Sequence, residues 1–110
     1  MRKITIKDIP LGYSHNSIAR KSILKKTDTL SKIESMNEAY LQPGEQVEAH
    51  SHEEAEEVFV FLAGLGEMKI DNQIVEIVNG DVILVQPHEV HVLTNTGKEP
   101  MKFFTFRVGL

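Results

Sequence analysis

The chain lacks the residue types that several kinds of site require. It has no cysteine, which excludes disulfide frameworks, zinc fingers, iron–sulfur clusters and thiol nucleophiles. Any metal site therefore has to use histidine and carboxylate ligands. No uninterrupted apolar run approaches the roughly 20 residues of a membrane span, and no hydrophobic region of a signal peptide follows Met1. We therefore expect a cytoplasmic protein with no membrane partner.

An excess of positive charge is also lacking. Twelve Lys and Arg residues against sixteen Asp and Glu residues give a net charge of -4, and neither half of the chain is strongly basic. Nucleic acid is therefore not expected as a partner. What the chain does contain is typical of one globular domain, since hydrophobic residues make up 41% of its 110 residues.

From about residue 28 onward, short runs rich in β-branched and aromatic residues alternate with turn residues. Helical periodicity is not sustained anywhere, and the runs recur about every eight to twelve residues, which is typical of an all-β sandwich or small barrel. Tight turns are expected at Pro43-Gly44 and at Asp71-Asn72. The expected strands are 33–41, 47–52, 57–62, 66–70, 74–78, 82–85, 88–94 and 101–108.

The first 27 residues differ in character from the rest. They are rich in lysine and arginine, and their apolar residues are too sparse for a core element. We expect an edge strand at 3–7 and then an extended arm, which either packs against a partner subunit or remains a solvated tail. The expected division is an arm over residues 1–27 and a barrel domain over residues 28–110.

Two middle strands are apolar on both faces. Val58 and Val60 alternate with Phe59 and Phe61, and all four residues of 82–85 are aliphatic. In a lone two-layer β domain, one face of each sheet would meet water and carry polar residues. We therefore expect the outer face to be covered, either by the arm or by another subunit, and the chain to form a homodimer.

Three histidines and one glutamate are spaced as metal ligands. His50 and His52 are two residues apart on an expected strand, so their imidazoles lie on the same side. Glu57 opens the next strand after a short acidic loop, and His91 lies on a later strand that completes the set if the barrel closes. Three imidazoles and one carboxylate suit divalent Fe, Mn, Ni, Cu or Zn, and suit Ca or Mg poorly.

Each of these residues also has an ordinary interpretation. A His-x-His pair can lie on the surface, the acidic loop can be solvated, and His91 alone can be a hydrogen-bonded core histidine. Two glutamates could supply the carboxylate ligand, because a helical turn after His52 would present Glu56 in place of Glu57. The joint spacing of the four residues favours a metal site.

The spacing resembles the cupin family from about residue 30 to residue 108. Its first motif is glycine, five residues, His-x-His, three or four residues, glutamate, six residues and glycine. Gly44, His50, His52, Glu57 and Gly64 match this pattern.

The second cupin motif is glycine, five residues, Pro-x-Gly, two residues, histidine, three residues and asparagine. Gly80, His91 and Asn95 lie at the matching positions. Gln86 and His88 depart from it, since they stand where the proline and the second glycine are expected. These two positions shape a turn and bind no metal in the family pattern.

The resemblance implies an antiparallel jelly-roll β-barrel, the double-stranded β-helix of cupins, with a divalent transition metal inside. It assigns His50, His52, Glu57 and His91 as ligands. It also implies a small-molecule metalloenzyme, either dioxygenase-like or acting by Lewis-acid chemistry on an oxygen-chelating substrate. Glu57 would be a permanent ligand or a general base, and His88 a second acid or base. The alternative is a non-catalytic cupin that binds or senses a small ligand.

The expected pocket lining is mostly apolar, which favours a neutral or aromatic substrate over small dianions and sugar phosphates. Cations could reach the pocket only from Arg107 or, in trans, from the arm residues Arg20, Lys21, Lys25 and Lys26. The expected apolar lining residues are Phe59, Phe61, Met68, Leu93, Met101, Phe104 and Phe106.

Overall fold

The computed structural model describes residues 1–14 and 17–110 of the chain. Within these residues the fold consists of strands and two short 3-10 helices, η1 (Ile6–Asp8) and η2 (Lys26–Asp28). The strands are β1 (Gly12–Ser14), β2 (Ile18–Lys25), β3 (Ile33–Leu41), β4 (Gln46–His50), β5 (Ala55–Ala63), β6 (Gly66–Ile70), β7 (Gln73–Ile77), β8 (Val82–Val85), β9 (His91–Asn95) and β10 (Met101–Gly109).

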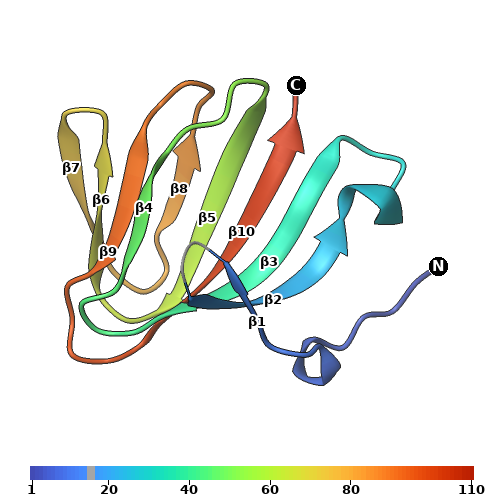
Figure 1. Cartoon of the computed structure of the whole chain (residues 1–110), viewed down its shortest axis with the longest axis horizontal. Coiled ribbons are helices and arrows are strands. Elements are labelled where there is room, and N and C mark those ends of the chain that lie inside the picture. Colours follow the sequence, from blue (N-terminus) through green and yellow to red (C-terminus); the bar gives the residue numbers. More distant parts are fainter. Residues whose placement is uncertain (15–16) are drawn as a thin grey trace.

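The strands form two antiparallel sheets. The six-stranded sheet has the order β1-β2-β3-β10-β5-β8, and the four-stranded sheet has the order β4-β9-β6-β7 (Figure 1). Strands that are neighbours in space are mostly not neighbours in sequence, as in a jelly roll. The expected all-β, antiparallel double-stranded β-helix is confirmed.

Turn residues and the alternation of apolar and polar residues explain most strand boundaries. Strands β3, β6 and β8 have the expected bounds, and β6 pairs with β7 across a tight turn in which Asp71 has a φ of 51°. Strand β9 begins at His91, three residues later than expected. The preceding residues form a turn in which His88 has a φ of 71°, a left-handed conformation that ends an extended strand.

The N-terminal expectation is wrong in part. Residues 3–7 form no strand, and Ile6–Asp8 form the 3-10 helix η1. The chain enters the sheet later, because β2 pairs with β3 from Ala19 to Lys25 and β1 pairs with β2. The boundary expected after residue 27 therefore falls between two paired strands of one sheet, and β2 is a wall of the barrel.

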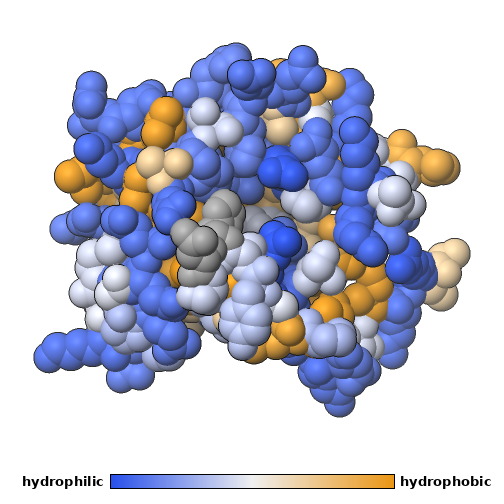
Figure 2. All heavy atoms as spheres, viewed as in Figure 1, coloured by the Kyte–Doolittle hydropathy of each residue, from blue (hydrophilic) through white to orange (hydrophobic). Residues whose placement is uncertain are grey.

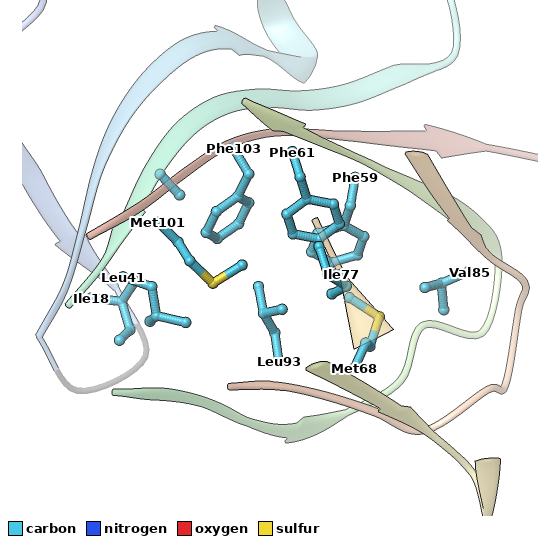
Figure 3. Packing of buried hydrophobic residues seen from close by; sticks show 11 residues of the cluster. Ile18, Leu41, Phe59, Phe61, Met68, Ile77, Val85, Leu93, Met101 and Phe103 are labelled. Atoms are coloured by element: carbon cyan, nitrogen blue, oxygen red, sulfur yellow. The ribbon is translucent and has the colours of Figure 1, made fainter. Parts of the chain in front are cut away.

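The core lies between the two sheets. Phe61 and Phe103 of the six-stranded sheet face Met68 and Leu93 of the four-stranded sheet (Figure 3), and all four side chains are buried. Successive residues of β5 and β10 alternate between this core and the outer face. Burial of these large side chains stabilises the pairing of the sheets, each contributing about 1.5–3 kcal/mol.

The surface fits the composition of the chain. Hydrophilic atoms cover most of the face drawn in Figure 2, with hydrophobic atoms in separate patches. The part of the chain that the structure describes contains no helix long and apolar enough to cross a membrane.

Candidate metal centre

Four side chains from both sheets meet at one end of the barrel. His50 ends β4, His52 lies in the following loop, Glu57 lies on β5 and His91 opens β9. One potential ligand atom of each lies within 4.8 Å of those of the others. His50 and His91 are register partners, with ring centroids 4.2 Å apart. The structure thus brings together the four residues that the sequence analysis singled out.

The carboxylate of this cluster is that of Glu57. No helical turn follows His52, because β5 begins at Ala55 and runs extended. Glu57 therefore lies on the same side of β5 as the buried Phe59, whereas Glu56 is on the opposite side. The alternative carboxylate, Glu56, is not brought to the cluster.

Backbone carbonyl groups orient two of the imidazoles. Nδ1 of His50 lies 2.8 Å from the carbonyl oxygen of Glu48, and Nδ1 of His91 lies 3.1 Å from that of Glu89. A carbonyl oxygen can only accept a hydrogen bond, so Nδ1 carries the proton in both rings. In a neutral ring Nε2 then carries the lone pair. Metal-binding histidines are held in this way by outer hydrogen bonds.

The third imidazole has a buried nitrogen without a hydrogen-bond partner. Nε2 of His52 makes no hydrogen bond in the described part of the chain, and it lies 3.5 Å from Oε1 of Glu57. The same carboxylate oxygen lies 3.3 Å from Nε2 of His91. A buried polar atom left unpaired costs about 1–3 kcal/mol, so such an atom points to a partner that binds there.

The site shifts three pKa values. Burial lowers the pKa of His52, and the charge of Arg107 adds to this effect. Burial acts to raise the pKa of Glu57, but the hydrogen bond with His91 and the histidine charges outweigh it, so the pKa falls. Burial acts to lower the pKa of His91, but contacts with Glu57 and the Glu89 carbonyl raise it overall. At neutral pH the cluster therefore presents a neutral His52 and an ionised Glu57.

These donors fit a divalent transition metal. The set of three imidazoles and one carboxylate matches the preferences of Fe, Mn, Ni, Cu and Zn, and no sulfur ligand is needed. Such an ion needs imidazole nitrogens that are not engaged in hydrogen bonds and rings that are held in place. Nε2 of His52 is unpaired, and backbone carbonyl groups hold the rings of His50 and His91. The cluster could therefore hold a metal whose identity the ligands alone leave open.

A cavity of about 290 Å³ adjoins the cluster, and its lining differs from the expected one. Among the described residues, Phe59 and Phe103 are the phenylalanines that line it, and Phe103 is not one of the expected residues. Phe61, Met68, Leu93 and Met101 are core residues instead, while Phe104 and Phe106 lie on the outer face of β10 by strand alternation.

The cavity wall is polar because β2 and β3 contribute to it. Arg20 and Lys25 line the cavity from β2 of the same chain, so cations need not come from a partner. Asn37 donates a hydrogen bond to the hydroxyl of Thr105 at 3.4 Å. The register places two rows of these residues across β2, β3, β10 and β5: Lys25, Ser35, Arg107 and Glu57 in one, and Ser22, Asn37, Thr105 and Phe59 in the other.

His88 is the one proposed site residue that the structure does not bring to the cluster. Its side chain is exposed and is not among those that line the cavity. Its backbone N–H donates a 2.7 Å hydrogen bond to the carbonyl oxygen of His52. His88 also takes a left-handed conformation, which glycine, the residue of the family motif at this position, adopts without strain.

Comparison with known proteins identifies the family. A model of the cupin domain family matches residues 37–107, a range that includes the whole cluster. The chain belongs to the cupin family. An uncharacterized protein of Methanocaldococcus jannaschii is 35% identical to this cupin over 69 residues, which are 63% of this chain and 55% of that relative. The matched region thus spans little more than half the length of the relative.

Solved structures share the fold. A protein of Thermotoga maritima described as a predicted oxalate decarboxylase has a TM-score of 0.93 at 24% identity, covering 99% of this cupin and 100% of that chain. The cupin domain of Schizosaccharomyces pombe Cnp3 has a TM-score of 0.84 at 13% identity, covering 98% and 74%. A Klebsiella pneumoniae protein with a double-stranded β-helix domain has a TM-score of 0.79 at 18% identity, covering 99% and 90%.

Proposed function

We propose that this cupin is a small-molecule metalloenzyme in which His50, His52, Glu57 and His91 hold a divalent transition metal. The observation that carries the proposal is the buried Nε2 of His52, which has no hydrogen-bond partner in the described chain. It lies in a cluster with potential metal-ligand atoms from three other residues. Structural metal sites are usually closed, whereas this cluster borders a cavity of about 290 Å³.

The residues of the chain have distinct parts in such a function. The carbonyl oxygens of Glu48 and Glu89 fix the rings of His50 and His91, so the ligands need little rearrangement. The ionised Glu57 contributes negative charge and, if it leaves the metal, is placed to accept a proton from a ligand in the cavity. A bound ion would supply Lewis acidity or, if redox-active, dioxygen activation of the dioxygenase-like kind.

The metal content of the purified protein tests this proposal. We expect about one equivalent of a transition metal per chain in protein that has met neither chelator nor a nickel column. His50→Ala and His91→Ala should lose most of it without unfolding, since loss of one of four ligands weakens a metal site strongly. His88→Ala is the matched control, because its side chain is exposed and outside the cluster. Full occupancy in both ligand variants would contradict the assignment.

Turnover separates the enzyme from the alternative of a ligand-binding or sensing cupin. Metal-loaded protein would be screened with oxygen-chelating substrates by oxygen consumption and product analysis, with Glu57→Gln as the inactive reference. Saturable binding without turnover, at full metal content, would favour the binding module over the enzyme.

A further inference from the structure

Arg107 contains the second buried side-chain atom of the described chain that lacks a hydrogen-bond partner. The two such atoms are Nε2 of His52 and Nε of Arg107. Both residues line the cavity beside the metal cluster. A metal would account for His52, but a metal cannot account for a guanidinium, because arginine stays protonated and has no lone pair to offer. The hydrogen-bond donors of Arg107 are therefore open to an occupant other than a metal.

The strand register places Arg107 beside the cluster. Arg107 on β10 is the register partner of Glu57 on β5 and of Ser35 on β3, on the inner face of the sheet. Its Nε lies 3.1 Å from Oε1 of Glu34, an ion pair that lacks the geometry of a hydrogen bond. The side chain is 38% exposed. The guanidinium is thus held at the cavity, and its fork of donors is suited to a planar anion.

The cavity is positive within a negative protein. Among its described lining residues, Arg20, Lys25 and Arg107 stand against the carboxylates of Glu34 and Glu57, an excess of one positive charge although the whole chain has a net charge of -4. The side chain of Arg20 makes no hydrogen bond or ion pair with the described residues, and Arg20 is only half-buried in the wall. Such a local excess of positive charge attracts anionic ligands to the site.

We infer that the ligand of this cupin carries a carboxylate group, which Arg107 binds while another oxygen of the same molecule reaches the metal centre. The inference rests on the proposed function only for the contact with the metal centre, since the contact between Arg107 and the carboxylate needs no metal. It replaces the preference for a neutral ligand that the sequence suggested. Arg107 is a specificity-determining residue in this reading, and the carboxylate is bound through two parallel N–H···O hydrogen bonds.

A matched pair of probes tests the inference. 3,4-Dihydroxybenzoate and its amide have nearly the same size and chelate metals through the same two hydroxyl oxygens, but only the first has a carboxylate. By titration calorimetry, metal-loaded wild-type protein should bind 3,4-dihydroxybenzoate about tenfold or more tightly than the amide, as expected for charge-assisted hydrogen bonds. Arg107→Gln should bring the two affinities to within about twofold of each other. Arg107→Lys should keep part of the preference.

Control measurements separate this inference from the metal centre. Lys69→Gln removes the same charge at an exposed position of β6 outside the cavity and should keep the full preference. The same titrations on metal-free protein should show weaker binding with the preference for 3,4-dihydroxybenzoate retained. A protein that takes up no metal but keeps an Arg107-dependent preference would sink the metal centre alone. Equal binding of the two probes, binding of neither, or an undiminished preference in Arg107→Gln would overturn the carboxylate site.

Discussion

At the residue scale, Asn95 joins three segments of backbone. Its Nδ2 donates to the carbonyl oxygens of Leu41, at 2.8 Å, and Glu99, at 2.9 Å, and its Oδ1 accepts a 2.9 Å hydrogen bond from the N–H of Gly97. The side chain is buried. The asparagine of the second motif therefore holds the loop between β9 and β10 against the end of β3, away from the metal cluster.

We expect Asn95→Ala to destabilise the fold by about 2–4 kcal/mol, because it removes three hydrogen bonds and leaves the buried carbonyl group of Leu41 without its donor. Chemical denaturation measures the change, with metal content recorded in parallel. Asn79→Ala is the control, since Asn79 is exposed in a turn, and it should change the free energy of unfolding by less than about 0.5 kcal/mol. Equal stability of the two variants would show that the hydrogen bonds of Asn95 contribute nothing.

Which residues of the site could be predicted depends on how local their pattern is. His50 ends β4, His52 lies two residues later in the loop, outside the strand expected for it, and Glu57 follows near the start of β5, so their closeness in the sequence already places them together. Arg20 and Arg107 come from distant strands, and a lone arginine on a strand has no spacing that distinguishes a cavity residue from a surface one. Only the register of β2, β3 and β10 brings them to the cavity.

At the element scale, strand β6 depends on the absence of a side chain at its first residue. A Cβ atom on Gly66 would lie 2.7 Å from the carbonyl oxygen of Thr94 and 2.8 Å from Cε of Met101. The backbone of β9 is the closer of these neighbours, and a backbone cannot move aside as a flexible side chain can. Gly66 therefore lets β6 pack closely against β9 and Met101.

Gly66→Ala should lower the free energy of unfolding by about 2–3 kcal/mol, since overpacking displaces backbone as well as side chains. Gly12→Ala is the matched control, because its added Cβ would meet only the carbonyl oxygen of Arg20 at 3.7 Å, an ordinary contact. Comparing the two in urea gives the result. A Gly66→Ala protein as stable as Gly12→Ala would show that the sheet adjusts without cost.

The residue pattern of β2 explains why the sequence does not predict this strand. Strands β6 and β8 place Met68 and Val85 in the core, so their hydrophobic patterns predict their bounds. Strand β3 ends at the core residue Leu41, just before the expected turn at Pro43-Gly44. The inward residues of β2 include Arg20 and Ser22, which line the cavity and not the core. A strand that lines a polar cavity has no hydrophobic pattern by which it could be predicted. The expectation of an extended arm over residues 1–27 is therefore wrong at β2, which forms part of the cavity wall.

At the scale of the whole molecule, an apolar strip crosses β8, β5 and β10 on the outer face of the six-stranded sheet. Val82 and Leu84 on β8 are 60% and 48% exposed, and by strand register they continue into Val58 and Val60 of β5 and then Phe104 and Phe106 of β10. The described arm residues leave Val82 and Leu84 uncovered. A second copy presents the same apolar strip, so two such faces match each other about a twofold axis.

We therefore expect a homodimer in sedimentation experiments at micromolar concentration, with Leu84→Lys shifting the protein to monomer. A charge buried in an apolar interface without a partner costs several kcal/mol, so dimer dissociation should increase about 100-fold or more. Ile74→Lys is the control, because Ile74 is equally apolar and 60% exposed but lies on the four-stranded sheet. A wild-type monomer, or equal dimerisation of the two variants, would exclude this face as the interface.

The position of the cluster has a consequence for how the barrel stays closed. His50 and His91 belong to the four-stranded sheet and Glu57 to the six-stranded one, and β4 has only three register pairs with β9, with an irregularity among them. An ion held by all of them would act as a reversible cross-link between the sheets in a chain that has no cysteine for a covalent one. The metal concentration would then determine how stable this end of the barrel is, because an ion that binds only the folded state raises the free energy of unfolding.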